Sequence, residues 1–169
     1  MESLLIYVAA SVAIISSAMV ITQLNAVHAL LYLILSLLAV GIIFYLLGAH
    51  FAAVLEVIIY AGAIMVLFVF VVMMLNLGNA TIALEQSWIK PRMWLGPSLL
   101  AVILLSELIL MFSQAVSVTA INLVDAKQVG ILLFGPYLLA VELASMLLLA
   151  GLIGAYHLGR RQTKANKET

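Results

Sequence analysis

The sequence predicts an all-α integral membrane protein with five transmembrane helices. Of its 169 residues, 67% are hydrophobic and 8% are charged, whereas a soluble domain carries about 25% charged residues. A soluble chain of this composition would lack the polar surface to cover itself, but in a bilayer the apolar side chains can face lipid. The apolar residues also fall into five long runs, each near the roughly 20 residues that span a membrane.

Short polar segments separate the five runs. The third and fifth runs exceed the minimal length, and we expect the third to tilt or to carry an irregular turn. In the fifth run, Gly135-Pro136 favours a helix that begins there, because proline suits a first helical turn. Residues 131–134 would then form a short leading segment. We expect one membrane domain over residues 1–169, with spans at about 4–21, 26–47, 51–77, 93–116 and 131–158 and a tail at 159–169.

Positive charges predict the orientation of the spans. Lys90 and Arg92 precede the fourth run and four basic residues lie in the tail, whereas the opposite side holds only Lys127. Cytoplasmic segments are enriched in Lys and Arg, so we expect a cytoplasmic C-terminus and a periplasmic N-terminus. No basic residue precedes the first run, which predicts a retained helix rather than a cleaved signal peptide. The formal net charge is zero and no basic stripe is present, so no nucleic-acid partner is expected.

Composition also bounds the chemistry of the chain. It has no cysteine, which excludes disulfides and thiolate ligation of iron–sulfur clusters. Its histidines follow no metal-binding spacing. His28 and His157 fall near one side of the membrane, where two readings stay open: a haem ligand pair, or the commoner solvated or capping histidine. With no nucleotide loop and no Ser–His–Asp set, we expect no cofactor, no metal and no catalytic residue in this chain.

Three carboxylates lie within the predicted spans: Glu56, Glu107 and Glu142. An apolar medium favours the neutral form of a carboxyl group, which suits a proton carrier. The alternative is a protonated or paired glutamate that only joins two helices by a hydrogen bond. Both readings stay open for Glu56 and Glu142. For Glu107, whose one polar neighbour within four residues is Ser106, the hydrogen-bond reading is favoured.

The third run has the most unusual local sequence. Glu56 and Tyr60 are four residues apart and share a helix face, where they could hold each other or a file of water. The small patch at Ala61-Gly62-Ala63 lets another helix approach closely, and a glycine lowers the cost of a π-bulge. On spacing alone, a plain packing notch is the simpler interpretation.

The fifth run contains two interleaved pairs of small residues. Ala150 with Gly154 and Gly151 with Ala155 repeat at the four-residue spacing typical of close helix–helix contacts in membranes. We therefore expect this face to pack against another helix rather than face lipid.

Four stretches carry a resemblance that covers about half of the chain. They are residues 25–36, residues 55–78, residues 130–137 and residues 141–151. These stretches closely resemble the chain J family of bacterial proton-translocating NADH–quinone oxidoreductase, respiratory complex I.

The resemblance implies a five-span, non-catalytic membrane-arm subunit of the bacterial inner membrane. NADH, FMN, iron–sulfur clusters and quinone would belong to partner chains, and the nearest partners would be membrane chains A, H and K. The third helix of the family can hold a π-bulge whose change gates a water path. At matching positions Tyr60, Gly62 and Val66 would form the gate and Glu56 a nearby polar site. Glu142 also matches the family pattern.

Three alternatives remain beside this interpretation. The first is a structural packing subunit without a proton role. The second is a stand-alone ion carrier using Glu56 and Glu142, although five helices are few and no inverted repeat is visible, as many transporters have. The third is the equivalent chain of a related membrane hydrogenase or dehydrogenase.

Overall fold

The computed structural model describes residues 2–75, 91–113 and 124–160, and every regular element in these ranges is helical. Five helical rods are long and apolar enough to cross a membrane, which confirms the predicted fold class. The rods are α1 (Glu2–Thr22), α2 (Ala26–Leu46), the continuous rod of α3 (His50–Leu55), η1 (Glu56–Ile64) and α4 (Met65–Leu75), then α6 (Pro91–Ser113) and α8 (Leu138–Gly159), with the shorter α7 (Ala126–Leu133) before α8.

Parts of the sequence-based expectations lie outside the described residues. These are the polar loop after the third span, the ends predicted at residues 77 and 116, and the basic tail beyond Arg160. The described helices fall into two compact units, Met1–Asp125 and Ala126–Thr169.

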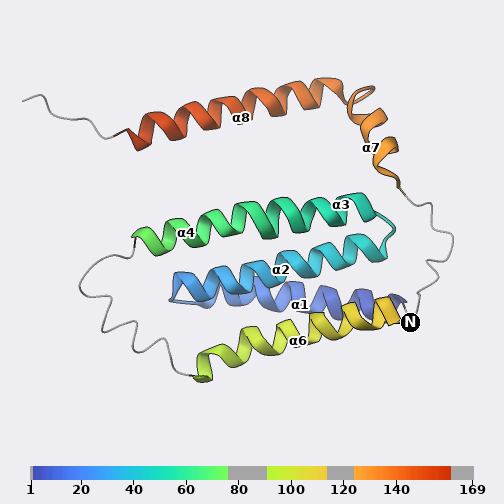
Figure 1. Cartoon of the computed structure of the whole chain (residues 1–169), viewed down its shortest axis with the longest axis vertical. Coiled ribbons are helices and arrows are strands. Elements are labelled where there is room, and N and C mark those ends of the chain that lie inside the picture. The colour runs from blue at the N-terminus through green and yellow to red at the C-terminus, as the bar shows by residue number, and fades with distance from the viewer. Residues whose placement is uncertain (1, 76–90, 114–123, 161–169) are drawn as a thin grey trace, which may run out of the picture. The chain divides into compact units, whose positions relative to one another are not determined.

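Helix α2 is the centre of the first unit. It packs against α1, against the third rod and against α6 (Figure 1). A cap at each end fixes the length of α2. The Asn25 side chain accepts a hydrogen bond from the backbone N–H of Val27 at 2.9 Å, as an N-cap does. At the other end Gly48 has φ 83°, a left-handed conformation that glycine adopts without strain.

The backbone bonds after α2 complete a Schellman motif. The Gly48 N–H donates to the Tyr45 carbonyl at 3.0 Å, and the Ala49 N–H donates to the Phe44 carbonyl at 2.9 Å. These are the two bonds that satisfy the last carbonyls of a helix. The chain then turns directly into α3, so α2 and the third rod are antiparallel neighbours.

Small residues and serine hydroxyls join α1 to α2. Ala9 and Ala39 are fully buried, and such small side chains let two helices approach closely in a membrane. The Ser17 and Ser36 hydroxyls share a hydrogen bond of 2.9 Å, and the Ser36 hydroxyl donates to the Ala13 carbonyl at 3.2 Å. Interhelical bonds of this kind contribute roughly 1 kcal/mol each in a membrane.

Helix α6 covers the remaining side of this pair and runs in the same direction as α2. Tyr32 lies directly against Gly96, near the start of both helices. Leu100 and Leu104 continue the contact into a buried cluster with Val12, Tyr32, Leu35 and Ala39. Beyond α6 the Val124 N–H donates to the Gly48 carbonyl at 3.3 Å, so the chain returns to the end of α2.

The third rod contains a nine-residue π-helical segment, Glu56–Ile64, between two α-helical pieces. This confirms the expected irregularity of the third span. The buried residues of the rod are Ala53, Ala61 and Met65, positions that all fall on a spacing of four. An α-helix turns such a stripe by about 40° at each step because it has 3.6 residues per turn. A π-helix has more residues per turn and rotates the stripe in the opposite direction. In this rod the two rotations offset each other, so the buried residues stay on one face.

The second unit differs in detail from the sequence-based expectation. The fifth span begins at Leu138, not at residue 131 or at Pro136. Residues 126–133 form the separate helix α7, and Gly135-Pro136 lies in the turn that follows. The Tyr137 N–H donates to the Leu132 carbonyl at 3.1 Å and the Leu138 N–H to the Gly135 carbonyl at 3.2 Å, which closes the turn before α8 begins.

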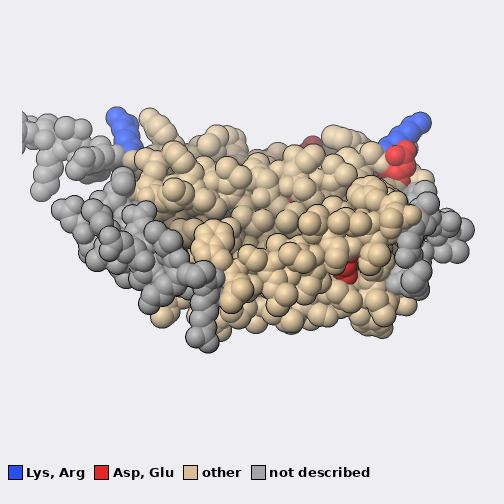
Figure 2. Space-filling view, turned by 60° about the horizontal axis from the view of Figure 1, so that its bottom comes forward, with Lys and Arg blue, Asp and Glu red and all other residues tan. Residues whose placement is uncertain are grey.

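Most of the described surface is uncharged. On the face drawn in Figure 2, blue and red atoms are few and uncharged residues cover nearly everything between them. Many large apolar side chains on α1, η1, α4 and α8 are exposed. This is the reverse of a soluble surface and fits helices that face lipid or other membrane helices.

Gly96→Ala should destabilise the first unit by about 1–3 kcal/mol, the usual penalty of overpacking. A Cβ atom there would overlap the buried Tyr32 hydroxyl. The double variant Gly96→Ala/Tyr32→Phe should recover part of the loss, because it removes the nearest atom. Thermal unfolding in detergent measures both. An unchanged transition in the single variant would contradict the close contact.

Candidate functional site

The π segment is the candidate functional site because it departs from regular helix within a membrane span. Its backbone widens so that each N–H reaches a carbonyl five residues back rather than four. In the widened helix the Val57 carbonyl lies close to Gly62, and a Cβ atom at Gly62 would lie 3.1 Å from that oxygen. A glycine at this position therefore relieves crowding in the π form.

Glu56 opens the π segment and faces α2. Its side chain is half-buried. A Cβ atom placed on Gly41 of α2 would lie 3.9 Å from the Glu56 Cγ and 3.3 Å from the Val57 Cγ2. Gly41 thus allows the two helices to approach where the carboxyl group begins. Gly41 was not among the predicted residues, although a glycine in the middle of an apolar span is a usable signal of a close helix contact.

Tyr60 and Val66 lie on the outer side of the same rod. Within the first unit Tyr60 is 52% exposed and Val66 is 65% exposed. Glu56 and Tyr60, expected to share a helix face, have different surroundings: Glu56 is half-buried beside α2, whereas Tyr60 is exposed. The π segment therefore places its carboxyl at a helix contact and its phenol on the open face.

The other predicted residues lie on α8, in the second unit. Glu142 is exposed there, and the Ser145 hydroxyl donates to the Glu142 backbone carbonyl at 2.8 Å. The small residues Ala150, Gly151, Gly154 and Ala155 lie further along the same helix, and Cβ atoms on the two glycines would meet nothing within 4 Å. The close packing predicted for them stays a prediction.

Two polar side chains, His28 and Glu107, are more deeply buried than the sequence indicated. His28, expected to be solvated or to cap a helix, is 5% exposed and forms an edge-to-face contact with Trp94 at 5.9 Å between ring centroids. Neither ring nitrogen has a hydrogen-bond partner among the described residues. Glu107, for which an interhelical hydrogen bond was favoured, is buried at 3% exposure and makes no such bond to the part of the chain that the structure describes. The described part of the chain holds no group of three potential metal ligands.

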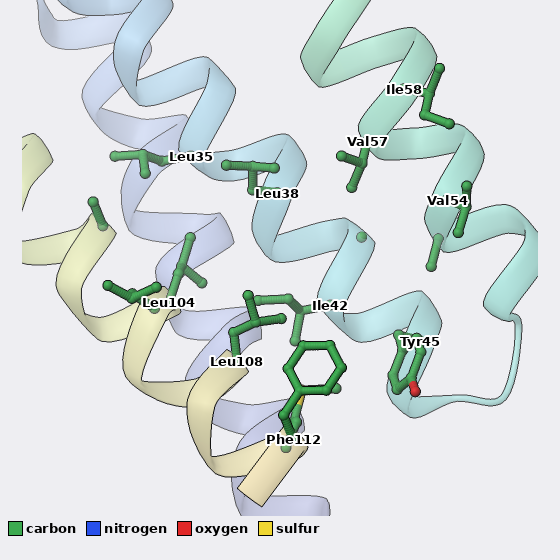
Figure 3. Close-up of a pocket in the computed structure, with 15 residues that line it drawn as sticks. Leu35, Leu38, Ile42, Tyr45, Val54, Val57, Ile58, Leu104, Leu108 and Phe112 are labelled. Carbon is green, nitrogen blue, oxygen red and sulfur yellow. The ribbon is translucent and has the colours of Figure 1, made fainter.

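An open apolar groove of about 550 Å³ runs along the first unit. Figure 3 shows its floor on α2, with Leu38 and Ile42, and its walls on either side. One wall holds Val54, Val57 and Ile58, and the other holds Leu104, Leu108 and Phe112. The groove contains almost no polar surface, so in this form it offers few hydrogen bonds to a file of water.

The arrangement is chemically suited to binding a proton. A carboxyl group at a membrane helix contact can hold and release a proton, because the apolar medium favours its neutral form. Tyr60 can donate or accept a hydrogen bond. A π segment is a local distortion of an α-helix that is frequent at functional sites, and the glycine within this one relieves its crowding. Together these features suit a conformationally gated site for protons or water.

Comparison with known proteins gives a consistent result. Residues 16–158 match the family model described as NADH-ubiquinone/plastoquinone oxidoreductase chain 6. A protein of Pseudomonas aeruginosa named NADH-quinone oxidoreductase subunit J is 60% identical over 160 residues, covering 94% of this chain and 96% of its own. Subunit J of Escherichia coli K12 is 56% identical (92% and 85% covered). Subunit J of Buchnera aphidicola from Schizaphis graminum is 50% identical (92% and 96% covered).

Disulfide trapping tests the approach of η1 to α2 at Gly41. The chain has no cysteine, so introduced pairs give no background within it. The double variant Gly41→Cys/Val57→Cys should cross-link readily in oxidised membranes, because a Cβ atom at Gly41 would lie 3.3 Å from the Val57 Cγ2. Mass spectrometry of the joined peptides measures the product. The pair Val40→Cys/Val57→Cys serves as the control, and equal or greater cross-linking there would contradict the described contact.

Proposed function

The chain belongs to the NADH-ubiquinone/plastoquinone oxidoreductase chain 6 family, and from this premise we propose that its π segment gates a water path that couples quinone reduction to proton translocation. It is a multi-pass inner-membrane subunit J of NADH–quinone oxidoreductase, respiratory complex I, and its partners are other subunits of that complex. The gate itself, the nearest partners and the orientation belong to the proposal.

The observation that carries the proposal is the nine-residue π segment inside one apolar span. A π segment and a regular α-helix are two discrete forms of the same stretch. If the extra residue of the π form were taken up into a regular α-helix, the part of the rod after it would rotate by about 100° relative to the part before it. The angle follows because an α-helix has 3.6 residues per turn. Two such forms make a switch that a distant event can bias.

The rotation would move Tyr60 and Val66 more than Glu56. Glu56 lies at the first position of the segment and is held by its contact with α2 at Gly41. Val66 lies beyond the end of the segment and would turn with α4. Tyr60 lies between them, so its hydroxyl would move relative to the Glu56 carboxyl. In one form a hydrogen-bonded file could join the two groups, and in the other Val66 would interrupt it.

The energy for this switch would come from outside the chain. Without cysteine it cannot ligate an iron–sulfur cluster through thiolates, and NADH, FMN, the clusters and quinone would be held by partner chains. We place membrane chains A, H and K beside it, with the C-terminus in the cytoplasm, where its four basic tail residues favour it. The subunit would be non-catalytic and would pass a conformational change from quinone reduction to the proton path.

A structural packing role is the second candidate, and the apolar faces favour it. Exposed large apolar side chains run along α4 and α8, and only burial by lipid or neighbouring helices accounts for such a surface. The small residues of α8 would then mark a contact with a partner helix. The two roles are compatible, but they differ in which substitutions affect turnover and which affect assembly.

Substitutions in the π segment should uncouple the assembled complex. Glu56→Gln, Tyr60→Phe and Gly62→Val should each lower proton pumping by roughly twofold or more, as expected when a proton-transfer group or its gate is lost. Gly62→Val acts by crowding the Val57 carbonyl. NADH oxidation and pumping are measured side by side in membranes, with assembly checked on native gels. Normal values in all three assembled variants would leave the subunit as a scaffold.

Bulky substitutions on α8 should instead affect assembly. Gly151→Leu and Gly154→Leu should each reduce the intact complex on native gels, through an overpacking penalty of about 1–3 kcal/mol. Ile153→Leu, on the same helix and without added volume, is the matched control. Full assembly of both glycine variants would show that this face meets lipid and not another helix.

A further inference from the structure

Glu107 on α6 is the most deeply buried carboxyl group of the chain among those whose side chains the structure describes. It is 3% exposed, whereas Glu56 is half-buried and Asp125 and Glu142 are exposed. It continues the buried face of α6 formed by Leu100 and Leu104, at the three- and four-residue spacings of one helix face. Its side chain is therefore enclosed by the helix bundle rather than turned toward lipid.

The carboxyl group has no polar partner in these surroundings. Both of its oxygens are buried without a hydrogen bond among the described residues. The neighbouring Ser106 hydroxyl donates instead to the Ile103 carbonyl at 2.7 Å. An ionised carboxylate in such a place would carry a desolvation penalty of several kcal/mol with nothing to offset it.

No cation is available to pair with it in the described helices around it. Helix α6 packs against α1 and α2, whose titratable side chains in the described set are Tyr7, His28, Tyr32 and Tyr45. Tyr7 and Tyr45 are exposed. Tyr32 lies against Gly96, about 16 Å along α6 from Glu107 at 1.5 Å per residue, and His28 lies further still. The neutral, proton-bound carboxyl is thus the form that this environment favours.

Glu107 and Glu56 lie at about the same depth. Helix α6 runs parallel to α2 and the third rod begins where α2 ends, so the end of α6 and the start of α3 lie on one side. Glu56 is about 9 Å beyond the start of α3, and Glu107 is about 9 Å before the end of α6, at 1.5 Å per residue. The two carboxyl groups therefore flank α2 at one level.

The apolar groove lies between the two helices that carry these groups. Val57, next to Glu56, lines one wall, and Leu108, next to Glu107, lines the other (Figure 3). A dry apolar passage blocks protons, and its wetting opens it, as in hydrophobic gates. Neither carboxyl group lines the groove itself: Val57 and Leu108 do, and each lies about 100° around its helix from the glutamate before it.

We propose that Glu107 is a second proton-binding site of this subunit, neutral in the resting complex and releasing and regaining its proton during turnover. On release the carboxyl O–H bond breaks, its electron pair stays on the carboxylate oxygen, and the proton passes to a water molecule that has entered the helix bundle. Rebinding reverses the step. The inference rests on the proposed function, because a gated water path has to bring water to this depth.

Infrared difference spectroscopy and pumping assays on the assembled complex test this assignment. Glu107→Gln keeps the shape of the side chain but cannot ionise, Glu107→Asp keeps a carboxyl group, and Ser106→Ala is the adjacent control. The wild-type minus Glu107→Gln spectrum should contain the carbonyl band of a protonated carboxyl group, and this band should shift in D₂O. Pumped protons per electron should fall roughly twofold in Glu107→Gln, recover partly in Glu107→Asp and stay normal in Ser106→Ala.

Two results would overturn the assignment. Carboxylate bands in place of the carbonyl band would show an ionised group paired in the complex, and unchanged pumping in Glu107→Gln would show a static one. Should Glu107→Gln fail to assemble, the wild-type minus Glu107→Asp spectrum decides by the same bands. Glu56→Gln and Gly62→Val, measured in parallel, separate the two proposals. Reduced pumping in these two variants with normal pumping in Glu107→Gln would contradict only the Glu107 site. Reduced pumping in Glu107→Gln with normal pumping in these two would contradict the gate.

Discussion

The structure depends on one constraint, that backbone N–H and C=O groups in the hydrocarbon region of a membrane must be paired within the protein. Helix is the form that satisfies this for an isolated span. It also explains how the third span can be irregular without being broken. The π segment keeps its N–H groups bonded to carbonyls, only one residue further back, so a second helical form is available at membrane depth without leaving polar groups unpaired.

Close approach between helices is the second determinant of the bundle. Lipid tails are as apolar as leucine, so burial of apolar surface does not drive membrane helices together and packing has to do so. Helix α2 meets each neighbour at a small residue: Ala39 is buried beside α1 and α6, Gly41 faces the π segment and Gly96 receives Tyr32. These positions set the distances between helices, and the π widening keeps the stripe of Ala53, Ala61 and Met65 on one side.

The polar groups inside this packing are few and differ in their surroundings. Ser17 and Ser36 bond to each other across a helix contact, which is a structural use. Glu56 lies beside a glycine at the start of a segment that can change form, and Glu107 lies in an enclosed apolar site without a partner. An unpaired carboxyl group in a membrane favours its proton-bound form, and on this ground we propose both groups as proton-binding sites.

The sequence by itself determined the class, the number of spans and the place of the irregularity. Composition and apolar run length reflect the transfer of side chains into lipid, which is a local property of each segment. Glu56, Tyr60 and Gly62 were singled out because they are close in the chain, and the family resemblance implied the gate role that we propose for them. The start of the fifth span was misplaced because Pro136 fits a turn as well as a first helical turn.

Only the tertiary structure decided which polar groups are enclosed. Gly41 acquires its importance from Glu56 and Val57, which lie on another helix, and Tyr32 and Gly96 meet across two helices far apart in sequence. Glu107 has one polar neighbour within four residues and drew little attention in the sequence, yet among the described carboxyl groups of the first unit it is the buried one. Burial and pairing are properties of contacts between helices, and an apolar span without a strong amphipathic pattern does not reveal which of its faces those contacts will cover.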